Sequence, residues 1–221
     1  KKPSFFRTLH TGSFIDRIPK IIHKKCYSFF NNIACSESVM NDLKSMGYNK
    51  KIYFINNGIK VDINFKNELK TYSNKNKFTL INIGSMNSVH GLKVKGHELL
   101  IKAVALLPKN LLKNTELIFL GDGTHINFYK SLAHDLKIDK KIKFKGLVSD
   151  VKQYLIKSDI AIFPSLFEGL PLAAIEASIV GLPLITSDIT AFDIFDNNCN
   201  LRFEKNNVKG LTNKIIYALE N

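Results

Sequence analysis

Short apolar runs alternate with longer segments of helical periodicity along residues 78–186, and this alternation restricts the fold more than any other feature of the chain. The candidate strands are 78–83 (FTLINI), 116–120 (ELIFL), 142–145 (IKFK), 159–163 (DIAIF) and 184–186 (LIT). The candidate helices between them are 96–107, 126–136, 150–157 and 171–180. Strands and helices that alternate at this spacing are typical of βαβ units. The sequence therefore predicts an α/β protein with a doubly wound, Rossmann-like parallel sheet and helices on both faces.

Glycine-rich turns follow directly after several of the candidate strands. They are IGS (83–85), GDG (121–123) and KG (145–146). In a doubly wound sheet the carboxyl ends of the strands form the edge at which ligands bind. We therefore expect a ligand site at these turns.

The first sixty residues have a different pattern. We expect a strand at 5–10, a helix at 18–30, a strand at 32–36, a helix at 37–47 that Ser36 caps, and a strand at 51–55. This is too little for a complete domain, but it fits the closing part of one. Residues 59–77 are polar and weakly periodic, which is typical of a linker. The predicted organisation is a partial domain over 1–58, a linker over 59–77 and a Rossmann domain over 78–221.

The chain carries a net charge of +13, and much of the excess lies near its start. Residues 1–60 contain eleven Lys and Arg residues against Asp16, Glu37 and Asp42. Such a surface attracts phosphorylated ligands, anionic lipid headgroups or nucleic acid, unless it reflects only a lysine-rich composition with solvated side chains. No RNA-recognition, zinc-finger or basic-zipper pattern is present, so we expect no nucleic-acid partner, although a basic nucleic-acid binder remains the weakest alternative.

The cysteines and the apolar runs indicate the cellular compartment of the protein. Cys26, Cys35 and Cys199 are odd in number and lack metal-ligand spacing, which suits reduced thiols. Acidic residues and prolines interrupt the longest apolar stretch, so it is not a membrane span. We therefore expect a cytoplasmic protein.

Two acidic residues, Glu168 and Glu176, interrupt the most apolar stretch of the chain, FPSLFEGLPLAAIEASIVGLPLITSD (163–188). Pro171 is predicted to begin a helix, which places Glu168 on the preceding loop and Glu176 on the second helical turn. The free N–H groups of a helix start suit a diphosphate, and a nearby carboxylate can accept hydrogen bonds from sugar or ribose hydroxyls. The alternative is that both acids face solvent or pair with lysines.

This stretch closely resembles the E-x7-E signature of the family-4 (group 1) retaining glycosyltransferases, which have the two-Rossmann GT-B architecture. The matching positions are Pro164, Ser165, Glu168, Gly169, Pro171, Glu176, Ala177, Gly181 and Pro183. The resemblance extends to CSESVMNDLKSMGYNKKIYFINNGIK, HELLIKAVALLP, LIFLGDGTHINFY, IKFKGLVSDVKQYL and SDIAIFPS, in the order of the family. It implies the C-terminal donor domain of a GT-B enzyme, preceded by the tail of its N-terminal acceptor domain.

The resemblance also implies roles for individual residues. Lys95, with the turn at Gly84 and Ser85, would contact the diphosphate, and Glu176 the ribose hydroxyls. Glu168 would lie beside the transferred sugar, and His10 would approach the reacting sugar from the N-terminal domain. The remaining predicted contacts are made chiefly by the backbone: Gly169, Leu170, Pro171 and Leu172 at the sugar and phosphates, and Lys145, Gly146 and Val148 at the nucleobase.

The chain departs from the family pattern in two respects. The family usually reads Gly-Arg where this chain reads Gly84-Ser85, and serine cannot replace the bidentate phosphate contact of arginine. Either Lys93 compensates or the affinity for the diphosphate is lower. In addition, much of the N-terminal domain is not represented, so we expect a fragment or truncated gene product.

The resemblance thus implies a retaining hexosyltransferase that moves a sugar from a UDP- or GDP-sugar to a hydroxyl of a glycan or lipid-linked glycan, in surface polysaccharide synthesis. No cofactor or metal is expected, because the chain contains no D-x-D, H-E-x-x-H or cysteine cluster. The basic residues 1–60 could place it peripherally at the anionic inner face of a membrane. The alternative is a nucleotide-sugar-binding module without catalysis.

Overall fold

The computed structural model describes residues 6–9, 31–45, 47–48, 51–55, 57–59, 77–89, 91–195 and 200–221. The chain divides into two compact units, which are treated separately below. The first comprises residues 1–60 together with 167–171, and the second comprises residues 61–166 and 172–221.

The first unit contains a parallel sheet with the strand order β1-β2-β3 (Phe6–Leu9, Asn31–Ala34 and Ile52–Phe54). Helix α2 (Glu37–Ser45) follows β2 because Ser36 caps it: the Ser36 hydroxyl accepts a hydrogen bond from the Val39 N–H at 3.2 Å. These elements confirm the strands and the capped helix predicted here. The predicted helix at 18–30 and most of the predicted linker lie outside the described residues.

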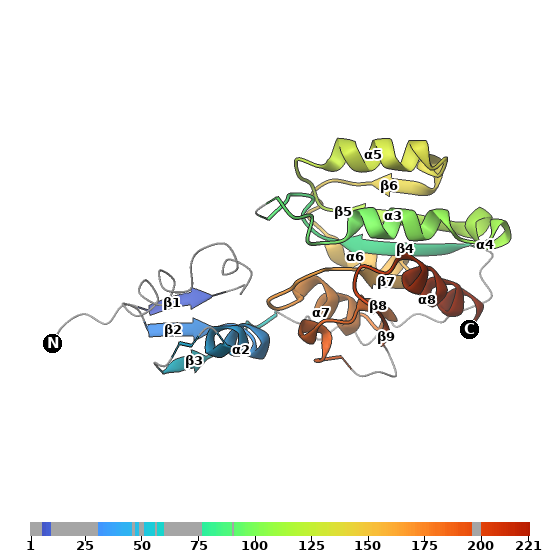
Figure 1. Ribbon diagram of the computed structural model, residues 1–221. Helices are drawn as coiled ribbons and strands as arrows, with labels where there is room; N and C mark the ends of the chain where they lie inside the picture. The colour runs from blue at the N-terminus through green and yellow to red at the C-terminus, as the bar shows by residue number, and fades with distance from the viewer. Residues whose placement is uncertain are drawn as a thin grey trace. The chain divides into compact units, whose positions relative to one another are not determined.

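The second unit is built on a sheet whose described strands, β4 to β9, all pair in parallel. Their order is β6-β5-β4-β7-β8-β9 (Figure 1). Strand order runs outwards from β4 in one direction and from β7 in the other, which is the doubly wound Rossmann arrangement with its switch point between β4 and β7. The strands are Phe78–Ile83, Thr115–Leu120, Ile142–Phe144, Ile160–Phe163, Leu184–Ser187 and Asn200–Phe203.

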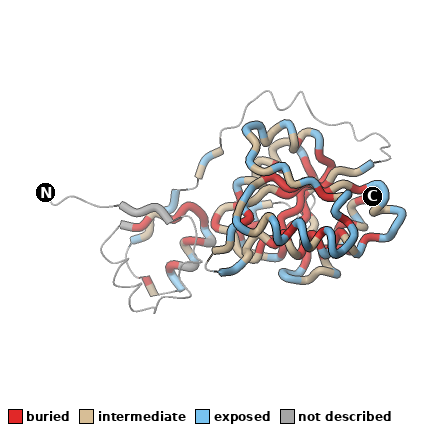
Figure 2. Tube along the Cα trace, turned by 90° about the horizontal axis from the view of Figure 1, so that it is seen from above, coloured by how far each residue is buried: buried red, intermediate tan, exposed pale blue. Residues whose placement is uncertain are grey.

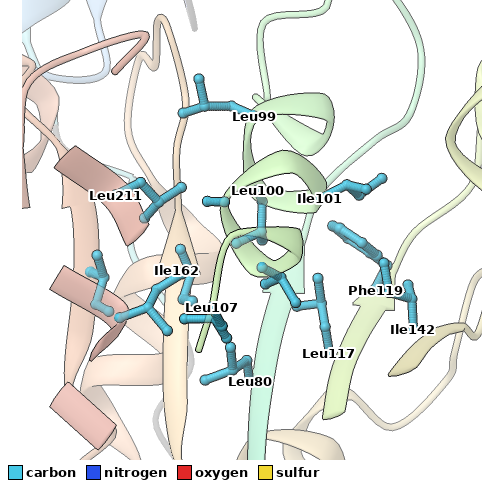
Figure 3. Close-up of a cluster of buried hydrophobic side chains, with 14 of the residues drawn as sticks. Leu80, Leu99, Leu100, Ile101, Leu107, Leu117, Phe119, Ile142, Ile162 and Leu211 are labelled. Atoms are coloured by element: carbon cyan, nitrogen blue, oxygen red, sulfur yellow. The ribbon is translucent and has the colours of Figure 1, made fainter. Parts of the chain in front are cut away.

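Helices cover both faces of this sheet, because alternate strand residues point to opposite sides and both sides are apolar. On one face Leu80 and Ile162 pack with the helices α3 and α8, as Figure 3 shows. On the other face Ile81 packs with residues of α6 and α7. The helices are α3 (His97–Ala105), α4 (Lys109–Asn114), α5 (Ile126–Asp135), α6 (Val151–Lys157), α7 (Leu172–Ile179) and α8 (Val208–Glu220).

Burial follows this layering in the second unit, where β4, β5, β7 and β8 contain no exposed residue and the helices that cover them carry exposed positions (Figure 2). The predicted α/β class and the doubly wound parallel sheet are therefore confirmed. Among the described elements, two α-helices and one strand were not predicted: α4, α8 and β9. The predicted start of α7 also needs correction, since the helix begins at Leu172 and Pro171 precedes it.

None of the described helices combines the length and the apolar character that crossing a bilayer requires.

Candidate functional site

The glycine turns after β4, β5 and β6 meet at one edge of the sheet. A Cβ atom on Gly121, which has φ +127, would lie 2.1 Å from the carbonyl oxygen of Gly84. The Gly121 N–H donates to the carbonyl oxygen of Gly146 at 2.8 Å. Gly121 must therefore be glycine, both for its backbone conformation and for this close approach. The expectation that these turns share the carboxyl edge of the sheet is confirmed.

The start of α3 lies against the end of β7, across the switch point. Gly96 has φ +69, and a Cβ atom there would lie 2.0 Å from the carbonyl oxygen of Pro164. The Leu166 N–H also donates to the carbonyl oxygen of Val94 at 2.7 Å. As a result, the free N–H groups at the start of α3 are held at the crevice where a doubly wound sheet binds its ligand.

Lys95 and Gly84 lie together at this crevice. A Cβ atom on Gly84 would be 3.5 Å from Cγ of Lys95, so the lysine stem runs along the Gly84 backbone. Ser85 is exposed, and its hydroxyl accepts from the N–H of Asn87 at 3.3 Å and from its Nδ2 at 3.1 Å. The structure thus brings together three of the predicted site residues, with an ammonium group beside a helix start. Both features favour an anion.

Lys93 has a different environment from Lys95. Its Nζ lies 3.4 Å from Oε2 of Glu98 and 3.3 Å above the centroid of the Phe128 ring. Glu98 also pairs with Lys102 at 2.7 Å, and this hydrogen bond is the main cause of its lowered pKa. Lys93 is therefore engaged away from Ser85, which argues against its replacing the family's arginine.

Glu176 lies on the second turn of α7, as predicted, and its side chain is half-buried. Burial raises the pKa of its carboxyl group above the usual range. In the part of the chain that the structure describes, this carboxylate has no hydrogen-bond or ion-pair partner. A carboxylate in this state can accept hydrogen bonds from hydroxyl groups of a ligand.

The segment 145–148 follows β6 at the same edge. The Lys145 N–H donates to the carbonyl oxygen of Phe119 at 3.0 Å, which extends the pairing of β6 by one residue. Gly146 has φ +68 and turns the chain, and Val148 then packs into the core beneath α6 and α7. The Lys145 side chain is exposed. Leu147 is exposed as well, and the role of this segment at the nucleobase stays a prediction.

The remaining predicted site residues lie at the start of α7, on the loop after β7 and outside the described residues. Leu172 is exposed as the first residue of α7. Glu168, Gly169, Leu170 and Pro171 lie on the loop that follows β7 and group with the first unit. His10 lies outside the described residues. The roles of these residues stay predictions.

One residue of this region was not predicted. His97, the first residue of α3, is 1% exposed, and its ring packs against the rings of Phe119 and Tyr129 with centroids 5.5 and 5.2 Å away. Burial, with a smaller effect of Lys95, lowers its pKa to about 4, although the Gly84 backbone partly offsets this shift. In the sequence, His97 could have been identified as a candidate site residue from its position next to Lys95 and Gly96.

Together these features define a Rossmann-like α/β domain with an anion-favouring helix start at its switch point. The family model of the glycosyl transferases group 1 matches residues 65–221. The chain belongs to this family.

Curated relatives and solved structures agree with this assignment. Over 100 residues the chain is 34% identical to an Escherichia coli enzyme named UDP-Gal:alpha-D-GlcNAc-diphosphoundecaprenol alpha-1,3-galactosyltransferase, a match that covers 45% of this chain and 24% of the relative. It is 28% identical over 123 residues to the E. coli O-antigen biosynthesis glycosyltransferase WclY, covering 54% of this chain and 35% of the relative. The matches thus span about a quarter to a third of these relatives.

The fold is shared with solved glycosyltransferases of the GT-B type. Anabaena Alr3699/HepE, solved in complex with UDP-glucose, superposes with a TM-score of 0.81 at 18% identity, over 99% of this chain and 63% of that one. The fold class predicted from the sequence is confirmed by this similarity.

Proposed function

We propose that the protein is part of a retaining glycosyltransferase that moves a hexose from a UDP- or GDP-sugar to a hydroxyl of a surface glycan under synthesis. The family membership and the names of the curated relatives, which include an O-antigen enzyme and a galactosyltransferase, support the reaction class. The resemblance of Phe163–Asp188 to the E-x7-E signature supports the retaining course.

The observation that carries the proposal is the placement of Lys95 along Gly84 at the start of α3. An ammonium group and free helix N–H groups at the switch point can neutralise the charge that develops on a departing nucleoside diphosphate. This favours breakage of the bond between the sugar and the phosphate. No metal is needed for this role in the proposal, in keeping with the lack of a D-x-D motif in the sequence.

Glu176 would orient the nucleotide. Its half-buried carboxylate has no partner among the described residues, so ribose hydroxyls would satisfy it. Glu168 would hold the transferred sugar, and His10 would approach it from the acceptor side. Holding the sugar and the attacking hydroxyl in fixed positions accelerates transfer.

The acceptor is proposed to be a glycan, in free or lipid-linked form. The name of one relative contains a diphosphoundecaprenol acceptor, which is a lipid-linked sugar. The eleven basic residues in 1–60 would attract the anionic inner face of a membrane, as expected for an enzyme with such an acceptor. Co-sedimentation with anionic but not neutral vesicles, weakened by salt, would test this membrane contact.

Titration calorimetry with UDP, GDP, their hexose derivatives and the free nucleosides tests the donor part of the proposal. We expect at least one diphosphate to bind more tightly than its nucleoside. Sugar transfer is then measured with the chain that includes the complete acceptor domain. Donor binding without any transfer by that chain would favour the alternative, a binding module without catalysis, and no binding of any nucleotide would contradict both.

A further inference from the structure

Two buried polar atoms beneath the Gly84 turn have no hydrogen-bond partner among the described residues. One is Nε2 of His97, and the other is Oδ1 of Asn82. Asn82 is 2% exposed and lies opposite Phe119 in the β4–β5 ladder, and the Phe119 ring is also the neighbour of the His97 ring. Unsatisfied buried polar atoms are costly and uncommon in native structures, so they often mark a functional site.

The Nε2 atom of His97 lies next to the Gly84 backbone. A Cβ atom on Gly84 would be 3.6 Å from this nitrogen and 3.5 Å from Cγ of Lys95. Gly84 is thus flanked by the imidazole and by the lysine stem. The imidazole is therefore a close neighbour of the peptide that joins Gly84 to Ser85.

That peptide also carries a donor without a partner. The N–H groups of Gly84 and Met86 donate to the carbonyl oxygens of Leu120 and Asp122 at 3.0 and 2.9 Å. The Ser85 N–H between them has no partner in the part of the chain that the structure describes. It lies at the same crevice as Lys95.

We propose that His97 is a positioning residue: when a nucleoside diphosphate binds beside Lys95, the unpartnered Nε2–H comes to donate to the Gly84 carbonyl group and thereby turns the Ser85 N–H toward the diphosphate. In a trans peptide the C=O and the N–H point in opposite directions, so a hydrogen bond that holds the Gly84 carbonyl inward directs the Ser85 N–H outward. This inference rests on the proposed donor function. It assigns to a backbone N–H part of the phosphate contact that the family's arginine would make.

The ring is well placed for this role. Because it is wedged between Phe119 and Tyr129, its orientation is fixed, and a rigid donor loses little entropy when the hydrogen bond forms. Tyr129 stays protonated, since burial and the nearby Glu98 raise its pKa to about 12, so its hydroxyl group brings no negative charge to the imidazole.

Calorimetry with UDP and uridine on four proteins tests the inference: the wild type, His97→Phe, His97→Gln and His125→Phe. Phenylalanine keeps the aromatic packing without the nitrogen, and glutamine restores a donor. His125 serves as the matched control, because its Nε2 is also buried and without a described partner, but it lies at the start of α5 and not of α3. We expect His97→Phe to weaken UDP about tenfold and uridine less than about twofold, as for one lost hydrogen bond to a charged ligand. His97→Gln should recover most of the UDP affinity, and His125→Phe should match the wild type.

The amide resonance of Ser85 in the wild type gives a second readout that does not depend on any variant. Its proton should shift downfield when UDP is added and should not shift with uridine. If the chemical shift of the Ser85 amide proton does not change when UDP is added, the inference is wrong. It is also wrong if His97→Phe loses UDP and uridine affinity equally. If the folded wild type binds no nucleotide at all, the proposed function fails and the inference fails with it.

Discussion

Gly96 lies directly against the carbonyl group of Pro164, so that a Cβ atom at this position would be 2.0 Å from the oxygen. The contact joins the start of α3 to the end of β7, and both the Lys95 ammonium and the helix N–H groups depend on it for their position. The backbone of Gly96 is also left-handed, with φ +69.

Gly96→Ala should lower the free energy of unfolding by about 3 kcal/mol, since it adds left-handed strain to a backbone clash. Gly91→Ala is the matched control: Gly91 also has a positive φ, +79, but a Cβ atom there meets nothing within 4 Å. Gly91→Ala should lower the free energy of unfolding only by the left-handed strain, about 1 kcal/mol. Urea unfolding of both variants measures the difference, and equal losses would show that the Pro164 contact is unimportant.

Lys95→Ala should weaken UDP binding about 10- to 100-fold and leave uridine binding unchanged, because the ammonium would meet only phosphate. Lys93→Ala is the control, since its ammonium is already engaged by Glu98 and the Phe128 ring. That variant should bind UDP like the wild type. A loss of the same size for UDP and uridine would mean that Lys95 supports the fold and does not contact phosphate.

Glu176→Gln should reduce the preference for ribose over deoxyribose, because it removes the charge and keeps an oxygen acceptor. We expect the wild type to bind UDP more tightly than 2′-deoxy-UDP by about 1.5–3 kcal/mol, the worth of a charge-assisted hydrogen bond. In the variant the difference should fall to about 0.5–1.5 kcal/mol, the worth of a neutral hydrogen bond. Glu116→Gln is a control on the same domain, because Glu116 pairs with Lys143 at 2.6 Å. Equal binding of both nucleotides by the wild type would remove the ribose role from Glu176.

Acid should destabilise the fold partly through His97, whose pKa falls from 6.5 to about 4 on folding. The folded state holds the neutral ring, so the contribution of His97 to the free energy of unfolding is complete above pH 6.5. It is lost between pH 6.5 and 4, because over this range the unfolded chain takes up a proton that the folded state does not. The loss should reach about 2–3 kcal/mol. Urea unfolding at several pH values should show a shallower decline for His97→Phe. Glu98, whose pKa is lowered by Lys102, adds an acid-dependent loss that both proteins share. Identical slopes would contradict a buried neutral His97.

Much of this fold could be predicted from periodicity alone. The runs from Phe78 to Thr186 and the helices between them lie within one or two residues of the predicted bounds, because a buried parallel strand must be apolar on both faces and a covering helix must have an apolar stripe. The elements α4, β9 and α8 were missed. β9 is a short edge strand, with two of its four residues only half-buried, so its apolar pattern is weak.

The sequence by itself determined the fold class, the family resemblance and the placing of Glu176 on the second turn of α7, since these depend on residue order over short distances. Tertiary structure alone decided what meets at the crevice: Gly84 beside Lys95 and His97, Gly96 against Pro164, and Lys93 drawn to Glu98 and Phe128. Such contacts join residues of different loops and helices, and the angle at which each loop leaves the sheet sets them. Periodicity carries no record of that angle, because it reports which face of an element is buried and not which neighbour covers it.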